Sequence, residues 1–198
     1  MYLTLQGEGT TAGDITYFIR TSRCNMVCPW CDTNFKSPTR KMTVDEIIKE
    51  VEKQEGCHAV CLTGGEPLLE KDAIELENKL VEMGYLTVVE TNGSMDVSGI
   101  RGQVSMDVKC PGSTHDGFIK LENFDVLLDK DQIKFVIGDL VDYDYAKSML
   151  KHVKKGQVLF MPVWDDECKM AKELGKWITE DRLNVRLALQ LHKILNVR

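Results

Sequence analysis

The stretch HAVCLTGGEPLLE, residues 58–70, decides the fold. Its first part, His58–Thr63, is a short apolar run of the kind that forms a buried strand. Two glycines and a proline then mark a turn, and a helical pattern follows over about Lys71–Met83 and stops at Gly84. A strand, a turn and a helix in this order form the repeating unit of a parallel α/β sheet.

The same alternation extends along the rest of the chain. Apolar, β-branched runs predict further strands at about Ile15–Arg20, Leu86–Glu90, Gln103–Val108, Gln132–Ile137, Gln157–Met161 and Val185–Gln190. Further helices are expected from the capping box of Thr43 and Glu46 onwards, and over about Asp142–His152 and Glu167–Thr179. No repeat or linker divides the chain, so we expect a single domain, residues 1–198. About six parallel strands are too few for a closed eight-stranded barrel, so we expect a partial (β/α) TIM-like barrel, open along one side.

Composition and charge exclude several classes of protein. The 198 residues carry a net charge of −6 without a lysine- or arginine-dense patch, which argues against direct nucleic-acid binding. The longest apolar runs are far below the ~20 residues of a membrane span, and no export signal opens the sequence. Seven cysteines, an odd number, then indicate a reducing compartment, where clustered thiols serve metal or redox chemistry. We therefore expect a cytoplasmic protein.

Residues typical of binding sites follow one expected strand after another. In parallel α/β sheets, ligands collect at the carboxyl ends of the strands, where loops lead into helices. The residues at these ends are Arg20 and the cysteines after it, Thr63–Pro67, Glu90–Ser94, Asp107–Lys109 and Met161–Trp164. Although they are scattered in sequence, we expect them to share one rim of the barrel.

Three of the cysteines, Cys24, Cys28 and Cys31, have the spacing C-x3-C-x2-C, which lets one loop wrap a single cofactor. Thiolates favour zinc or iron–sulfur clusters. A closed structural zinc site needs four ligands, whereas three cysteines on a [4Fe–4S] cluster leave one iron open to bind another molecule. A zinc site completed by a distant residue, or three thiols without a metal, remain alternatives on spacing alone.

The other cysteines and the histidines carry weaker signals. Cys61 lies in a strand run and is interpreted as a small buried hydrophobic residue. Cys168 is interpreted as a helix residue without a specific role. Cys110 follows the Asp107–Lys109 stretch and is the candidate for a further reactive thiol. Three histidines are interpreted as surface or packing residues: His58, His115 and His152.

The cysteine pattern, with Trp30 directly before its last cysteine, resembles the signature of the radical S-adenosylmethionine superfamily. Gly64–Pro67 resembles the methionine-binding stretch of the same superfamily. Within it, the chain resembles the 7-carboxy-7-deazaguanine synthase family nearly from end to end, at Leu5–Gly9, Phe18–Arg20, Trp30–Thr33, Leu62–Leu68, Glu90–Gly93 and Gln190–Lys193. One departure is that the chain starts almost directly at Leu3, without the short strand that often precedes the first of these motifs.

The resemblance implies that S-adenosylmethionine binds the open iron of a [4Fe–4S] cluster held by Cys24, Cys28 and Cys31. Gly64 and Gly65 would let the backbone approach the methionine end, and Glu66 would accept a hydrogen bond from its ammonium group. The adenosyl side would be lined by Trp30, Cys31, Asp32, Asp107, Val108, Lys109, Met161, Pro162, Val163 and Trp164.

The resemblance also implies Mg2+, with Thr33 as its protein ligand. Magnesium prefers oxygen ligands and keeps several waters, so one hydroxyl and substrate oxygens suffice. The alternative is that Thr33 caps a local turn.

The substrate that the resemblance implies is 6-carboxy-5,6,7,8-tetrahydropterin. A guanidinium offers two parallel donors to a carboxylate, which favours Arg20 for that end of the substrate, with Arg23 as the competing residue. Residues near the two ends of the chain would face the heterocycle, and Thr63 would add a hydroxyl contact. The full set of implied substrate-binding residues is Leu5, Gln6, Gly7, Glu8, Arg20, Thr63 and, through its terminal carboxylate, Arg198.

In the reaction that the resemblance implies, an adenosyl radical removes hydrogen from C6 of the pterin, the ring contracts and ammonia leaves. The product, 7-carboxy-7-deazaguanine, is a precursor of modified tRNA bases such as queuosine or archaeosine, and the enzyme is a carbon–nitrogen lyase. The radical chemistry belongs to the cofactor, so no side chain is assigned a catalytic role. The implied partners are an unidentified electron donor and a second copy of the chain, which would cover the open side of the barrel.

Two other functions share part of this pattern. An activase of a glycyl-radical enzyme would use the same cluster and cofactor on a backbone glycine, but Gln6–Glu8 and Arg20 favour a small carboxylated heterocycle. A non-catalytic iron–sulfur carrier would need the three cysteines but not the series of strand-end motifs.

Overall fold

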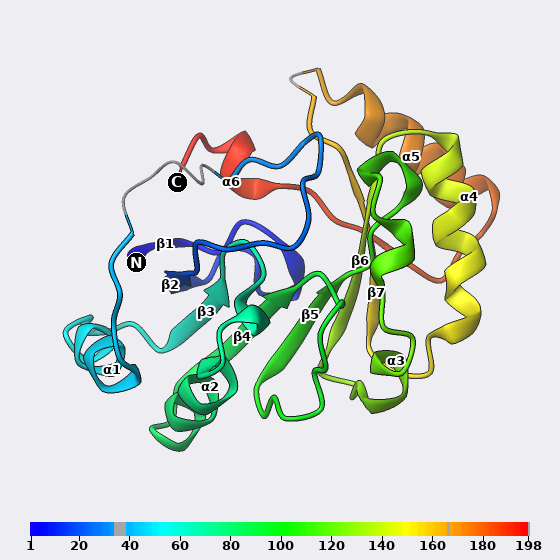
Figure 1. Ribbon diagram of the computed structural model, residues 1–198. Coiled ribbons are helices and arrows are strands. Elements are labelled where there is room, and N and C mark those ends of the chain that lie inside the picture. The colour runs from blue at the N-terminus through cyan, green and yellow to red at the C-terminus, as the bar shows by residue number, and fades with distance from the viewer. Residues whose placement is uncertain (34–38, 166, 198) are drawn as a thin grey trace.

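The computed structural model describes residues 1–33, 39–165 and 167–197 (Figure 1). Within these ranges the strands form one eight-stranded sheet in the order β1 to β8. Every neighbouring pair from β2 to β8 is parallel, and β1 pairs antiparallel with β2. The strands are β1 Tyr2–Leu5, β2 Ile15–Arg20, β3 Ala59–Thr63, β4 Leu86–Thr91, β5 Gln103–Asp107, β6 Gln132–Ile137, β7 Gln157–Pro162 and β8 Arg186–Leu187.

Helices α2, α4 and α5 pack on the outer face of this curved sheet, as Figure 1 shows for α2 and α4. The α-helices are α1 Val44–Glu52, α2 Ala73–Glu82, α3 Asn123–Val126, α4 Leu140–Met149, α5 Lys169–Glu180 and α6 Leu191–Ile194. Short 3-10 turns occur at Gly9–Thr11, Pro67–Leu69, Pro111–Ser113, Asp116–Phe118 and Leu150–His152. In the described part of the chain β1 and β8 are not paired, so the predicted open, partial (β/α) barrel is confirmed.

The expectation that no strand precedes the first motif is wrong. Residues Tyr2–Leu5 form β1, and the Tyr2 ring stacks on Phe18 of β2 with ring centroids 5.3 Å apart. This strand has only four residues and is paired on one side, so its period-two pattern is too short to stand out in the sequence. At the other edge, β8 is shorter than expected and pairs only at Arg186 and Leu187.

The core lies mainly between the strands and the outer helices. Buried side chains such as Val89, Met106, Ile133 and Phe160 belong to this cluster. A smaller apolar cluster of Phe18, Cys61 and Val88 fills the bottom of the barrel. The packing interpretation of Cys61 is therefore confirmed, since it is fully buried.

Cys110 is not the reactive thiol that its position suggested. It is 1% exposed, it packs in the apolar core with its Sγ donating to the carbonyl oxygen of Val108, and burial raises the pKa of the thiol. A thiol held neutral in this way is a poor nucleophile.

Local signals set the ends of two helices as expected. Thr43 and Glu46 form the capping box at the start of α1, with Glu46 Oε2 accepting from the Thr43 backbone N at 2.8 Å. Gly84, with φ 90°, follows the end of α2 in the left-handed conformation. These two ends position the strands that carry the cavity residues.

Glu77 ties α2 to the sheet, and its loss is expected to destabilise the fold. Its side chain is buried, and it accepts from Thr87 Oγ1 at 2.6 Å, Gly102 N at 2.7 Å and Arg101 N at 3.1 Å. Glu77→Ala leaves these donors without a partner and is expected to lower the free energy of unfolding by about 3 kcal/mol, measured by denaturant titration. Glu75→Ala, on the exposed face of the same helix, is the control and is expected to change it by less than about 0.5 kcal/mol. Equal losses in the two variants would contradict the anchoring role.

Across residues 1–33, 39–165 and 167–197, no helix has the length and apolarity needed to cross a bilayer.

Candidate active site

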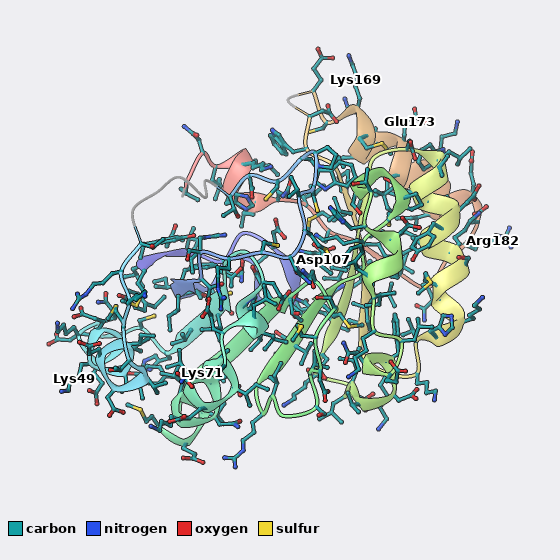
Figure 2. The ribbon with its side chains drawn as sticks, in the orientation of Figure 1. Lys49, Lys71, Asp107, Lys169, Glu173 and Arg182 are labelled. Atoms are coloured by element: carbon teal, nitrogen blue, oxygen red, sulfur yellow. The ribbon has the colours of Figure 1, made fainter. Side chains whose placement is uncertain are left out.

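A cavity of about 710 Å³ lies at the carboxyl ends of the strands. Its wall takes residues from the loop after β1, from the loop after β2, and from the ends of β3, β4, β5 and β6. Figure 2 shows Asp107, at the end of β5, near the middle of the molecule and far from the labelled residues on the outer helices. The prediction that the strand-end residues share one rim is confirmed.

Most of the residues expected from the sequence line this one cavity. They are Leu5, Gln6, Gly7, Glu8, Arg20, Cys24, Cys28, Trp30, Cys31, Asp32, Thr33, Thr63, Gly64, Gly65, Asp107, Lys109, Val163 and Trp164. Four expected residues do not line it: Glu66, Val108, Met161 and Pro162. Arg198 lies outside the described residues.

Val108 is absent from the cavity wall for a simple geometric reason. Successive side chains of an extended segment point to opposite faces, and Asp107 and Lys109 take the cavity face. Val108 therefore points into the core. In the second stretch Met161 is fully buried and only Val163 and Trp164 line the cavity, so the expected wall is corrected to Asp107, Lys109, Val163 and Trp164.

The loop that carries the cysteines rests directly on the Gly64–Gly65 turn. Thr21 N donates to Thr63 O at 2.8 Å, Gly65 N donates to Thr21 O at 3.2 Å, and Glu66 N donates to Arg23 O at 2.7 Å. These bonds continue the β2–β3 pairing beyond the strands. The cysteine loop and the glycine turn therefore form one unit.

Gly65 is required by this close approach. A Cβ at Gly65 would lie 2.0 Å from Arg23 O and 2.8 Å from the Cβ of Cys24. The sequence argument assigned the missing side chain to the approach of a methionine group. The structure shows that it is also needed for the approach of the cysteine loop itself.

Two further contacts hold the cysteine loop from other elements. Asn25 accepts from Asn92 Nδ2 and donates to Ser94 Oγ, both at 2.9 Å. The backbone N of Val27, next to Cys28, donates to Nε2 of His115 at 2.9 Å. His115 was interpreted only as a surface or packing residue, and the sequence held no signal for this bond. Residues 21–28 of the cysteine loop are therefore held in place by neighbouring elements.

The donor set fits an iron–sulfur cluster with three protein ligands. Cys24, Cys28 and Cys31 all line the cavity, and they are the cysteines among its described lining residues. Within the described residues, no three His, Cys, Asp or Glu side chains lie in an arrangement that could hold one metal ion. A cubane binds each cysteine to a different iron and so spreads the sulfurs over a larger body. The chemistry of three thiols beside a side-chain-free turn suits such a cluster.

Glu66 has a different role from the one expected. It is fully buried, and its carboxylate accepts from Leu68 N at 3.0 Å, Thr91 Oγ1 at 2.8 Å and Asn92 N at 2.6 Å. Burial raises the pKa of this carboxyl, although these donors and Lys109 oppose the shift. Glu66 therefore fixes the turn to the end of β4, and it is not among the residues that line the cavity.

The two candidate arginines have clearly different surroundings. Arg20 lines the cavity, and its guanidinium donates to Thr33 Oγ1 at 3.0 Å, Gly64 O at 3.2 Å and the Tyr2 hydroxyl at 3.2 Å. Arg23 instead forms a two-point contact with Glu70 at the surface, with both N–O distances 3.0 Å. The geometry therefore favours Arg20. It also places the Thr33 hydroxyl beside Arg20 and Gly64.

A charged network that the sequence reasoning missed forms one wall of the cavity. Lys134 Nζ lies 2.6 Å from Glu8 Oε2 and 3.7 Å from Asp107 Oδ2, and Lys109 Nζ lies 2.9 Å from the same oxygen. Burial opposes ionisation of Glu8, but Lys134 and a hydrogen bond from Gln190 outweigh it and lower the pKa of Glu8 to about 2. The signal available in the sequence was a lysine in the second position of the otherwise apolar run IKFVI, residues 133–137.

Glu90 is a second residue that was not assigned to the site. It accepts from Gln6 Nε2 at 3.1 Å and from Thr63 Oγ1 at 2.7 Å, and it lines the cavity. Gln6 Oε1 in turn accepts from Glu8 N at 3.2 Å. These bonds orient Gln6 and Thr63 before any ligand binds.

The C-terminal helix α6 closes one side of the cavity. Leu191 N donates to Gly7 O at 2.8 Å, and a Cβ at Gly7 would lie 2.1 Å from His192 Nδ1. Asp32 Oδ2 lies 3.8 Å from His192 Nε2 and 3.5 Å from Lys193 Nζ. A hydrogen bond from His192 and the charge of Lys193 hold the pKa of Asp32 well below its usual range. The helix therefore links the loop after β1 to the end of the cysteine loop.

Comparisons with known proteins agree with this geometry. The family model of the radical SAM superfamily matches residues 18–102. The 7-carboxy-7-deazaguanine synthase of Koribacter versatilis is 36% identical over 98% of this chain and 94% of its own length. The enzyme of the same name from Methanospirillum hungatei is 35% identical over 100% of this chain and 84% of its own length.

Solved structures show the same fold. QueE from Escherichia coli superimposes with a TM-score of 0.76 at 22% identity, covering 97% of this chain and 92% of that one. Streptococcus suis SuiB, in a crystal structure with S-adenosylmethionine bound, gives a TM-score of 0.62 at 15% identity, covering 88% of this chain and 49% of SuiB.

Proposed function

Because the chain belongs to the 7-carboxy-7-deazaguanine synthase family of radical S-adenosylmethionine enzymes, we propose that it converts 6-carboxy-5,6,7,8-tetrahydropterin into 7-carboxy-7-deazaguanine. The observation that carries the proposal is that one cavity combines three thiols, a glycine turn and a polar wall around a cavity-facing arginine. The substrate and the product differ by one molecule of ammonia, so the reaction needs no net oxidant or reductant.

The cofactors of this family are a [4Fe–4S] cluster and S-adenosylmethionine, and we assign the cluster to Cys24, Cys28 and Cys31. When bound, they supply an adenosyl radical at the end of the cavity formed by the cysteine loop. The protein's part is to hold that loop against Gly65 and to exclude water around the reacting carbon. Asp107, Lys109, Val163 and Trp164 line the side on which we place the adenosyl group.

For the substrate, we assign the carboxylate end to Arg20. A guanidinium carries five N–H donors, more than its three hydrogen bonds to other described residues require. The heterocycle then faces Gln6, Glu8 and Thr63, which Glu90 and Lys134 hold in place. This arrangement places a cationic end of the cavity against the substrate carboxylate and a hydrogen-bonding end against its heterocycle.

The test is anaerobic reconstitution with iron and sulfide, followed by reduction and addition of S-adenosylmethionine, Mg2+ and the pterin. We expect a product lighter than the substrate by ammonia in mass spectrometry, and none in a parallel reaction without reductant. Cleavage to 5′-deoxyadenosine with an unchanged pterin would contradict the substrate and favour an activase. A protein that binds iron but cleaves no S-adenosylmethionine would contradict the enzyme itself and favour a carrier.

We propose Thr33 as a ligand of Mg2+, because its hydroxyl lines the cavity between Arg20 and Gly64 O. Thr33→Val is expected to weaken the stimulation of initial rate by Mg2+ and to lower kcat/KM by about tenfold, because magnesium requires oxygen ligands. The measurement is a Mg2+ titration after removal of metal with a chelator. Thr179→Val on exposed α5 is the matched control, and a Thr33→Val titration curve that overlays it would refute the ligand assignment.

The domain, the dimer, the electron donor and the use of the product complete the proposal. We propose that the chain works as one domain over residues 1–198 and that a second copy covers the unpaired edges of the sheet, where Leu3 and Leu187 are exposed. The electron enters from a separate donor, and the product serves the synthesis of 7-deazapurine bases in tRNA. The donor reaches the protein from the cysteine-loop side, where Val27 is exposed next to Cys28.

A further inference from the structure

Lys134 occupies an unusual position for a lysine. It lies in the middle of β6 and is 7% exposed, between Ile133 and Phe135, which are fully buried in the outer core. Because side chains alternate along a strand, Lys134 points the other way, into the barrel, together with Val136. The proposed function above does not by itself require a lysine there.

The charges around Lys134 alternate in sign along the cavity wall. Its ammonium lies 2.6 Å from Glu8 and 3.7 Å from Asp107, and Asp107 lies 2.9 Å from Lys109. Glu90 on β4, Cys28 in the cysteine loop and His192 on α6 also act electrostatically on members of this network. Buried ion pairs contribute little net stability compared with apolar residues of similar size. The network therefore points to a role in binding rather than in folding.

The ionisation of Glu8 matters for what it can bind. An ionised carboxylate only accepts hydrogen bonds, whereas a protonated one also presents a donor. The amino group and ring N–H of a pterin are donors, so they need an ionised acceptor. Burial alone would favour the neutral acid, and Lys134 is the nearest cation that opposes it.

We propose that Lys134 is a positioning residue that keeps Glu8 ionised and aimed at the donor edge of the heterocycle, and that it joins this edge to the cofactor side through Asp107. The inference rests on the proposed function, because it takes the pterin as the molecule bound at Glu8. Lys134 acts through Glu8 and does not itself contact the reacting carbon.

The test measures equilibrium binding of the tetrahydropterin to reconstituted enzyme with S-adenosylmethionine but without reductant, so that no turnover occurs. For Lys134→Met, we expect Kd relative to wild type to rise by about 100-fold at pH 5 and by a smaller factor at pH 8, because Glu8 then gains a proton at acidic pH. Because variant and wild type are compared at the same pH, the titration of the pterin affects both Kd values equally and cancels in their ratio. Lys155→Met, in the exposed turn before β7, is the matched control and is expected to keep a ratio near one.

Two further variants separate this role from a general loss of structure. In a Glu8→Gln background, Lys134→Met is expected to have almost no further effect, because the two residues act as a unit. Lys109→Met removes the other partner of Asp107 and is expected to weaken S-adenosylmethionine binding. Its Kd for the pterin relative to wild type is expected to stay independent of pH. A pH-independent ratio for Lys134→Met, or additive effects with Glu8→Gln, would overturn the inference.

The result for the wild-type enzyme distinguishes a failure of the Lys134 proposal from a failure of the proposed function. If reduced wild-type enzyme converts the pterin and Lys134→Met binds it as wild type does, the role of Lys134 is wrong and the function stands. If wild type neither binds nor converts the pterin, the proposed function itself fails.

Discussion

Gly65→Ala is expected to reduce reductive cleavage of S-adenosylmethionine by at least about 100-fold, because the cysteine loop must move to make room for one methyl group. The new Cβ would lie 2.0 Å from Arg23 O and 2.4 Å from Arg23 C. Both are backbone atoms, so no rotation of a side chain relieves the clash. The next residue along is Cys24, and its displacement misplaces a cluster ligand. The measurements are iron and sulfide content after reconstitution and 5′-deoxyadenosine formed per minute.

Gly117→Ala is the matched control for this substitution. A Cβ at Gly117 meets no atom within 4 Å, and its backbone does not adopt a positive φ. We expect this variant to bind iron and to cleave S-adenosylmethionine as wild type does. Full cluster content with wild-type cleavage in Gly65→Ala would show that the glycine turn and the cysteine loop are not the rigid unit described here.

Arg20→Gln is expected to lower kcat/KM for the pterin by about 100- to 1000-fold, because the two-donor, charge-assisted contact of the guanidinium to the substrate carboxylate is lost. The side chain lies in the cavity, beside Thr33 and Gly64. Reductive cleavage of S-adenosylmethionine without product formation is expected to continue, because the cysteine loop keeps its contacts with the Gly64–Gly65 turn. Product and 5′-deoxyadenosine are quantified in the same reactions, so that binding of the substrate is separated from generation of the radical.

Arg23→Gln supplies the comparison, since this side chain pairs with Glu70 outside the cavity. It removes the same charge three positions further along the chain, and kcat/KM is expected to stay within about twofold of wild type. Equal losses in the two variants would mean that overall charge, and not the position of the guanidinium, governs substrate binding.

The sequence predicted the fold well where a pattern was long. The parallel strands from β2 to β7 and the capped start of α1 all lie close to their expected places. The terminal strands β1 and β8 were missed or misjudged, because edge strands of four and two residues carry too little periodic signal. Their pairing depends on neighbours that are distant in the sequence.

The sequence predicted which stretches form the site, but not which side chains of each stretch face the cavity. Spacing alone placed Cys24, Cys28 and Cys31 on one loop, and the strand-end rule placed that loop beside Gly65. Which way each side chain points depends on the register of the strand, which turned Val108 into the core. Glu66 was misassigned because its partners come from β4, which the local sequence does not show.

Lys134 shows the limit most clearly. Its partner Glu8 lies 126 positions earlier in the chain, so only the assembled barrel brings the two charges together. A lysine inside an apolar run predicts that an anionic or hydrogen-bonding partner offsets the cost of burying its charge, but the run does not identify that partner.

The contact between the first and last parts of the chain also sets an order of assembly. Thr21 and Arg23 meet Gly65 and Glu66 after only about forty intervening residues, whereas Gln190 meets Glu8 across 182 positions. Closing the longer loop costs more entropy, and during synthesis its second half leaves the ribosome last. The half of the cavity that holds the metal ligands can therefore form on a nascent chain while the substrate half is still open. The side of the cavity that α6 covers closes only when Leu191 docks on Gly7.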